Sequence, residues 1–387
     1  MVRKQHLLSS ELNRDVLRVD KMLYDLTKRF EILNYVNPVN LEREKRRFFK
    51  HNGSINPDFR YRQLNINPFE FKRKLYAIPV ENIRDIGLQA LYKDVINTYA
   101  DKVDMLASIG TDRFVLNSVR YFGRPSDLDL RNAEFLLSCP DDAVEHPKNL
   151  TAEEAKVVFE EAVREYGFKC KIEISTKTTA EAMVLNYQRT LRLKKGAMFS
   201  EFFINALVNH EIGVHMVTTI NATLQPLQVF KLGLPVNTKT QEGLAVLAEY
   251  LCGSITIRRL KELGLRVVAI DRMLEGHDFK SVYQHLVAEL NIDSDRAFQL
   301  CTRVFCGGGF TKDYLYLNGL REVLEYYRSG NPLDNLLIGK TSMSHLPTLN
   351  ELVERKMLLP PKYMPSVYEN PVEPDPILKF VVDGIEG

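Results

Sequence analysis

The stretch N-H-E-I-G-V-H, Asn209–His215, combines two histidines with a glutamate, the residue types found in zinc hydrolase sites. The familiar H-E-x-x-H motif places its histidines four residues apart, whereas His210 and His215 lie five apart. At about 100° per residue, a regular α-helix would turn their side chains roughly 140° away from each other. A π-bulge lets residue i+5 take the place of residue i+4, and Gly213 is where the backbone absorbs it most easily. The spacing therefore predicts a π-type irregularity, with both imidazoles facing one point and Glu211 beside them.

A third metal ligand is expected in T-Q-E-G-L-A-V-L-A-E-Y, Thr240–Tyr250. We expect Glu242 to open a helix in an apolar neighbourhood, where an unpaired carboxylate would be costly. A carboxylate that is simply favoured by the helix dipole is the alternative explanation. Glu249 is the competing ligand, and we favour it as a partner for an imidazole N–H. Two histidines, a glutamate and a neighbouring glutamate base form a gluzincin-type set, which predicts one Zn²⁺ per chain.

Composition narrows the possible functions. The chain has 387 residues, and its 52 basic and 50 acidic residues nearly cancel, which gives no electrostatic reason to expect nucleic acid. The sequence contains no run of about eighteen apolar residues, so it predicts no membrane span. Residues 1–20 lack the apolar core of a signal peptide. Five scattered cysteines fit a reducing compartment, so a cytoplasmic location is expected. Cys301 and Cys306 are interpreted as packing residues, with half a metal site as the alternative.

The periodicity of apolar residues predicts an α+β fold, mostly helical with a small embedded sheet. Alternating polar and apolar residues indicate the strands, and capping residues indicate where helices start. We expect a helix that is capped by Thr151 and Glu154 and ends at Gly167. We expect strands over 168–175 and 182–193, the second of them at the sheet edge. Helices are expected from Gln241 to about Met357.

The metal motifs also carry a family resemblance. H-E-I-G-V-H followed by Q-E-G-L-A resembles the QEGLA-motif family, catalogued as modulators of flavohaemoglobin expression, and the chain is similar to its bacterial-type members. Eukaryotic relatives of that family are the microtubule-associated tyrosine carboxypeptidases. The other landmarks, which extend the resemblance over about residues 50–360, are Asn56-Pro57-x-Phe59-x-Tyr61, Ile78-Pro79-Val80-Glu81, Gly110-Thr111-x-x-Phe114 and Phe310-Thr311-Lys312-Asp313.

The resemblance implies a zincin-like metallopeptidase with zinc on His210, His215 and Glu242, and with Glu211 as catalytic base. It also implies removal of a C-terminal aromatic residue, Tyr or Phe. Compared with tubulin-processing members, the segment between His215 and Glu242 is shorter, and a long basic flank is missing. We therefore expect a peptide or protein C-terminus as substrate, with no nucleic acid or membrane partner, and tubulin is a doubtful substrate.

A carboxypeptidase needs a cation for the terminal carboxylate of its substrate. Arg303 and Lys312 flank three glycines, 307–309, whose backbone N–H groups could face an anion. The alternative is a turn between helices with surface cations. Tyr316, one turn after Lys312, could donate to the oxyanion, and Asn186 on the expected edge strand could hydrogen-bond an extended substrate.

These expectations divide the chain into a charged helical segment (1–60), a zinc metallopeptidase domain (61–358) and a Pro-rich extended arm (359–387). Two other functions stay open beside the carboxypeptidase. One is a zinc amidase or dipeptidase acting on small metabolites. The other is a non-enzymatic regulatory protein with a structural metal, which a fourth protein ligand such as Glu249 would favour.

Overall fold

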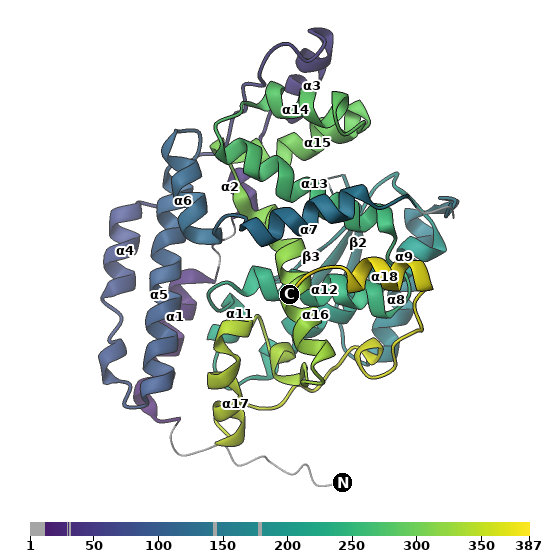
Figure 1. Cartoon of the computed structure of the whole chain (residues 1–387). Helices are drawn as coiled ribbons and strands as arrows, with labels where there is room; N and C mark the ends of the chain where they lie inside the picture. The colour runs from purple at the N-terminus through teal and green to yellow at the C-terminus, as the bar shows by residue number, and fades with distance from the viewer. Residues whose placement is uncertain (1–11, 29, 31, 142–144, 177–179) are drawn as a thin grey trace.

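The computed structural model describes residues 12–28, 30, 32–141, 145–176 and 180–387. The predicted α+β class is confirmed: helices dominate, and the described strands form a two-stranded and a three-stranded sheet (Figure 1). The strands are β1 (Leu150–Thr151), β2 (Lys171–Ser175), β3 (Ala182–Leu185), β4 (Thr190–Lys194) and β5 (Met198–Phe199).

The helices surround these strands, with α4, α5 and α6 side by side and α12 and α16 packed together in the middle (Figure 1). Between α9 and α10 the chain forms a π-helix, η2 (Val208–Met216). The α-helices are α1 (Arg14–Thr27), α2 (Leu33–Val36), α3 (Leu41–Lys50), α4 (Pro68–Tyr76), α5 (Ile86–Ala107), α6 (Arg113–Phe122), α7 (Asp127–Ser138), α8 (Ala152–Tyr166), α9 (Glu201–Leu207), α10 (Val217–Leu224), α11 (Val229–Leu232), α12 (Asn237–Leu251), α13 (Ile257–Leu274), α14 (Phe279–Ala288), α15 (Ser294–Phe305), α16 (Leu315–Arg328), α17 (Leu346–Glu354) and α18 (Pro376–Asp383).

The three-stranded sheet presents an edge strand to the π-helix. Its order is β2-β4-β3, with β2 parallel and β3 antiparallel to the central strand, and β3 contacts η2. The strand predicted over 168–175 is confirmed as β2. The single edge strand predicted over 182–193 is wrong, because β3 and β4 form a hairpin around a turn at 186–189. The turn residues N-Y-Q-R include no Gly or Pro, and Arg189 adopts the positive φ of +48° that Gly or Asn usually takes.

Helix α1 is fixed against the body by a buried carboxylate. Asp20 accepts hydrogen bonds from the Tyr92 hydroxyl at 2.8 Å and from the backbone N–H groups of Gln228 and Val229 at 2.8 and 2.9 Å. These contacts join α1 to α5 and to the start of α11. The apolar face of α1 packs into the same core, with Val19 and Leu23 buried.

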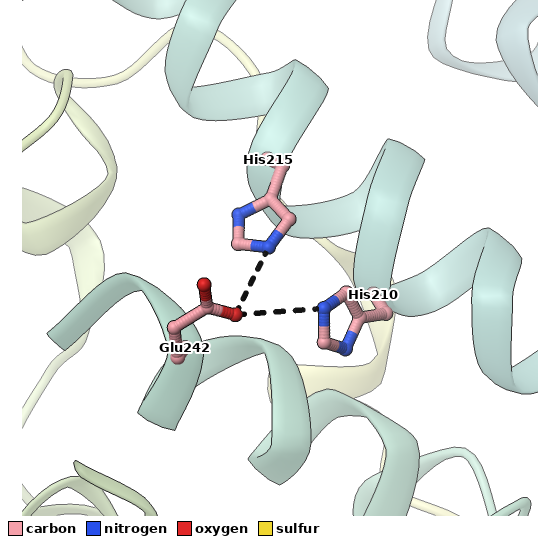
Figure 2. Close-up of side chains that lie close together, drawn as sticks. All are labelled: His210, His215 and Glu242. Atoms are coloured by element: carbon pink, nitrogen blue, oxygen red, sulfur yellow. Dashed lines mark ion pairs between the residues drawn. The ribbon is translucent and has the colours of Figure 1, made fainter. Parts of the chain in front are cut away.

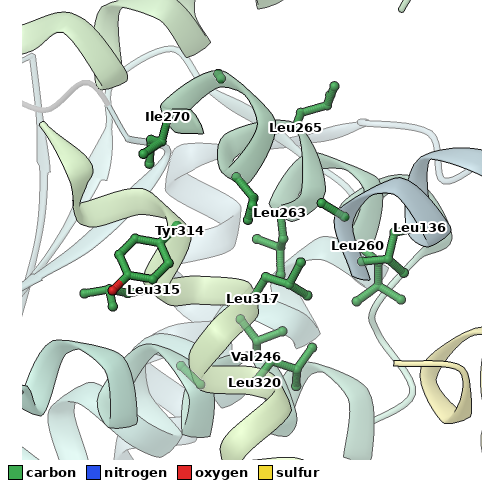
Figure 3. Packing of buried hydrophobic residues seen from close by; sticks show 14 of the residues in the cluster. Leu136, Val246, Leu260, Leu263, Leu265, Ile270, Tyr314, Leu315, Leu317 and Leu320 are labelled. Atoms are coloured by element: carbon green, nitrogen blue, oxygen red, sulfur yellow. The ribbon is translucent and has the colours of Figure 1, made fainter. Parts of the chain in front are cut away.

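The centre of the largest core is the crossing of α12 and α16, where two glycines meet. Figure 3 shows Val246 of α12 beside Leu317 and Leu320 of α16, with leucines of α13 packed above them. A methyl group on Gly243 would lie 2.3 Å from the carbonyl oxygen of Gly319. Only glycine permits so close a crossing. The crossing brings Glu242, the residue before Gly243, toward the segment that precedes α16 and contains Lys312.

We expect Gly243→Ala to destabilise the fold by about 3 kcal/mol, because the helices must move apart to admit the methyl group. Urea unfolding followed by circular dichroism would measure this loss. Gly87→Ala is the matched control, since it is also helical and its added methyl would meet nothing closer than 3.4 Å. The control should lie within about 1 kcal/mol of wild type. Equal midpoints for the two variants would contradict the close-packing account.

The C-terminal residues do not form the extended arm that their prolines suggested. Residues 376–383 form α18, and its Leu378, Val381 and Val382 are buried in the largest core. Proline at the first position of α18 starts the helix, since its missing N–H would be unpaired there anyway. The capping box of Thr151 and Glu154 is confirmed.

All five cysteines are free, and Cys301 and Cys306 are buried as expected of packing residues. In the part of the chain that is described, none of the helices combines the length and the apolar character needed to cross a membrane.

Candidate metal centre and adjoining cleft

The motif His210–His215 lies within the π-helix. Residues Val208–Met216 form nine residues of π-helix, so the predicted irregularity is confirmed and is longer than a single-residue bulge. Its wider turn brings residue i+5 above residue i, and the two imidazole centroids lie 4.9 Å apart with their planes at 82°. Gly213 keeps a negative φ; a methyl group there would lie 3.3 Å from the Tyr166 hydroxyl oxygen. The five-residue spacing therefore places both rings on one side of the helix.

Glu242 reaches this pair from α12. Its Oε2 lies 3.9 Å from Nε2 of His210 and 3.6 Å from Nε2 of His215 (Figure 2). Within the described residues, these three form the single group of His, Cys, Asp or Glu side chains whose ligand atoms all lie within 4.8 Å of one another. The donors are of the types that zinc prefers, so the residues fit this metal.

The position of Glu242 in its helix differs from the expectation. Helix α12 begins at Asn237, so Glu242 lies in the second turn and does not open the helix. The helix dipole acts mainly within the first turn, so it offers little explanation for this carboxylate. Lys312 explains it better, because its ammonium donates to Glu242 Oε1 at 3.1 Å and leaves Oε2 facing the histidines.

Charges around Glu242 keep it ionised. Burial alone raises the pKa of the Glu242 carboxyl, but the charge of Lys312 and the contacts with His215 and His210 together lower it well below its ordinary value. Burial also lowers the pKa of His215, which favours the neutral imidazole. A carboxylate and a neutral imidazole are the forms that bind a metal ion.

Glu249 contacts the second ring nitrogen of His210. The Nδ1 of His210 lies 2.7 Å from Glu249 Oε1, and Arg259 donates to both Glu249 oxygens at 3.1 Å. Burial raises the pKa of Glu249, but Arg259 and His210 lower it to about 2. Glu249 therefore stays charged, accepts the Nδ1 proton of His210, and leaves Nε2 free to bind a metal.

We expect Glu249→Gln to weaken zinc affinity by about tenfold, because a neutral amide orients and polarises the His210 imidazole less strongly. Competition with a chromophoric chelator would measure this. Glu289→Gln is the matched control, since Glu289 also pairs with a histidine Nδ1, that of His285, at 2.8 Å. The control should retain the affinity of wild type. Unchanged affinity in Glu249→Gln would remove Glu249 from the support of the site.

Glu211 lies next to His210 and is buried. Its Oε2 accepts a hydrogen bond at 3.1 Å from the backbone N–H of Val184, on the edge strand β3. The strand thereby fixes one oxygen of the carboxylate and leaves the other available. Because Val184 donates away from β4, its backbone faces the open side of the sheet.

A cleft of about 690 Å³ adjoins these residues. Val184 and Lys312 line it, and they are hydrogen bonded to Glu211 and Glu242 respectively. Tyr24 of α1 and Lys28, which follows the end of α1, also line the cleft. None of the described lining residues is acidic, whereas several are basic: Lys28, Lys102, Arg189, Lys231, Lys312 and Lys340.

Two of the predicted substrate contacts lie elsewhere. Arg303 forms a two-pronged ion pair with the buried Asp313 and is not among the described residues that line the cleft. Gly307 packs against the Phe114 ring, which a methyl group would approach to 2.4 Å. The Gly307 N–H donates to the Tyr61 hydroxyl at 2.9 Å, so this glycine serves packing, and the anion-binding role of the glycine run stays a prediction.

The remaining predicted residues surround Glu242 and the turn after β3. Lys312 does line the cleft, but its ammonium is held by Glu242 and by the Tyr316 hydroxyl at 3.2 Å. The cationic groups of Lys312 and Arg266 each lie 4.7 Å from the centroid of the Tyr316 ring. Asn186 lines the cleft from the hairpin turn, not from a strand, and its Oδ1 accepts from Thr219 at 2.9 Å.

Lys340 is the residue that sequence reasoning missed. It is buried and lines the cleft. Burial lowers the pKa of its ammonium to about 8, although the carboxylates of Glu242 and Glu211 oppose this. A signal was present, since Lys340 is the sole Asp, Glu, Lys or Arg residue between Asn335 and Asn350.

Comparison with known proteins adds two findings. The family model described as microtubule-associated tyrosine carboxypeptidase matches residues 46–386. A protein of Mus musculus named "Putative tyrosine carboxypeptidase MATCAP2" is 24% identical over 364 residues, which are 87% of this chain and 59% of the mouse protein. The chain thus spans little more than half the length of this relative. The candidate metal ligands lie inside the matched region, and α1 precedes it.

Proposed function

The chain belongs to the microtubule-associated tyrosine carboxypeptidase family, and from this premise we propose that it is a zinc-dependent carboxypeptidase. The proposed reaction removes a terminal Tyr or Phe from a peptide or protein. The observation that carries it is the cluster of His210, His215 and Glu242 with Glu211 beside it. The aromatic preference rests on the family.

The donor set supports zinc as the cofactor. Two imidazoles and one carboxylate supply three ligands, and His210 would bind through Nε2 because Glu249 occupies its Nδ1 side. When bound, zinc acts as a Lewis acid and makes water a stronger nucleophile near neutral pH.

Glu211 would carry the proton. Its carboxylate is fixed by the Val184 N–H through one oxygen, so the other oxygen can accept a proton from the attacking water. The same carboxyl would then protonate the leaving amine. Because Glu211 is buried beside the metal ligands, the proton would move over a short path shielded from bulk water.

The cleft suits an extended peptide. Strand β3 is an edge strand that lines the cleft, so a substrate backbone could lie beside it even though its Val184 N–H is held by Glu211, and Asn186 follows at the end of the strand. The basic lining favours acidic residues before the terminal one. Both features support a peptide in preference to a small neutral metabolite.

The non-enzymatic alternative has less support. It called for a closed site with a fourth protein ligand such as Glu249. That carboxylate instead contacts Nδ1 of His210 and the guanidinium of Arg259, on the far side of the imidazole from Glu242. Glu249 thus acts as a support for a ligand.

The test uses zinc-loaded protein and peptides that differ only in their last residue, each with acidic or neutral preceding residues. Mass spectrometry should show loss of one residue from peptides ending in Tyr or Phe, faster with acidic preceding residues. Cleavage of none of them by folded, zinc-loaded protein would favour a small-molecule amidase or a regulatory metal protein.

A further inference from the structure

A carboxypeptidase must recognise the free carboxylate at the end of its substrate, and a buried cation near the reacting bond is the usual physical means. The two cations predicted for this task are committed elsewhere. Arg303 is paired with Asp313, and Lys312 is paired with Glu242. A different cation is therefore required.

Lys340 meets the requirements. Only 8% of its surface is exposed, and it lines the cleft together with Lys312. Over the described ranges, its ammonium makes neither a hydrogen bond nor an ion pair with another residue. Lys340 shares the cleft with Lys312, which is hydrogen bonded to Glu242, and with Val184, which is hydrogen bonded to Glu211, so it lies on the cleft that adjoins the proposed reaction centre.

The backbone around Lys340 is firmly held. Its N–H donates to the Phe230 carbonyl at 3.0 Å, and its carbonyl accepts from the Leu234 N–H at 2.8 Å. Gly339 lies against Phe230, where a methyl group would approach the Phe230 Cβ to 2.7 Å. The next residue, Thr341, is fully buried and donates to the Leu336 carbonyl at 2.6 Å. Such support positions a side chain before the substrate arrives.

We propose that Lys340 binds the terminal carboxylate of the substrate and so restricts cleavage to the last residue. This inference rests on the proposed carboxypeptidase function. An ammonium on a mostly buried side chain without a protein partner is unfavourable, and an incoming carboxylate would supply the missing partner. Lys312 would then position Glu242 while Lys340 positions the substrate.

The test compares a peptide ending in tyrosine with the same peptide ending in tyrosinamide, using zinc-loaded protein. Wild type should favour the free acid. In Lys340→Met, kcat/KM for the free acid should fall about 100-fold while that for the amide is unchanged. Lys231→Met, which removes another lysine of the cleft, should change both rates by the same factor. Lys340→Arg should keep the preference for the acid, because it keeps the charge.

Binding provides a measurement that does not depend on turnover. Calorimetry should show N-acetyltyrosine binding at least about tenfold more weakly to Lys340→Met than to wild type, with no change for N-acetyltyrosinamide. Methionine keeps most of the length of the lysine side chain and removes its charge, so the variant should fold at least as stably as wild type. Zinc content and thermal unfolding would verify this.

The outcomes separate the two proposals. If wild type cleaves neither peptide but binds the acid through Lys340, the reaction is wrong and the carboxylate site stands. If Lys340→Met cleaves the peptides and keeps the preference for the free acid, the inference about Lys340 is wrong and the carboxypeptidase stands. Binding of acid and amide that is equal in wild type also overturns the inference.

Discussion

Glu211→Gln is expected to lower kcat on a peptide ending in tyrosine by about 1,000-fold while leaving zinc content and thermal stability unchanged. Glutamine has the same size as glutamate, and its carbonyl oxygen can still accept the Val184 N–H, so the buried site should keep its shape. It cannot accept a proton from water, which removes the proposed base. Mass spectrometry of the products and metal analysis of the same preparation would measure both effects.

The control for this variant is Glu160→Gln, a half-exposed glutamate on α8 that pairs with Lys156 on the surface. It should keep the activity of wild type. If Glu211→Gln retains more than about a tenth of that activity, another group takes the proton, and Glu211 serves only to hold the edge of β3.

The metal cluster was largely predictable because its signals are local. The spacing of His210 and His215 implied a π-type helix, and the structure contains one. Glu242 stood out as a carboxylate in an apolar stretch, and it meets the histidines. Its place within α12 was wrong by about one turn, since the helix continues back to Asn237 without a side-chain cap to mark its start.

The cations were predicted less well because their roles depend on partners distant in the sequence. Lys312 and Glu242 are 70 residues apart, and no local pattern shows that they form an ion pair. Arg303 and Asp313 are separated by 10 residues and by a glycine run that resembles an anion-binding loop. Once both pairs form, Lys340 is the buried cation among the described residues that line the cleft, and it lay outside every motif considered.

The hairpin shows a similar limit at the level of the backbone. Residues 182–193 alternate well enough to suggest one strand, and the turn within them carries its positive φ on Arg189. An arginine is an unusual residue for that conformation, so turn chemistry gave no signal. The consequence for the site is direct, because the hairpin makes β3 an edge strand beside Glu211.

His215→Ala is expected to abolish zinc retention, reducing the metal content from one ion per chain to less than about a tenth. The variant loses one of three proposed ligands, and the remaining His210 and Glu242 make an incomplete set. Burial lowers the pKa of His215, so the wild-type imidazole is neutral and ready to bind metal at neutral pH. Metal analysis after dialysis against a weak chelator would measure the loss.

The matched control is His345→Ala, because the two histidine side chains are similarly accessible, 14% for His215 and 13% for His345, and burial lowers both pKa values. His345 contacts Asp94 and lies outside the cluster, so its loss should leave zinc content unchanged. Metal-free His215→Ala should unfold cooperatively, like metal-free wild type, since its backbone is held by the π-helix and by the core beneath it. Equal metal content in the two variants would show that the five-residue spacing does not build a metal site, and the proposed mechanism would fail with it.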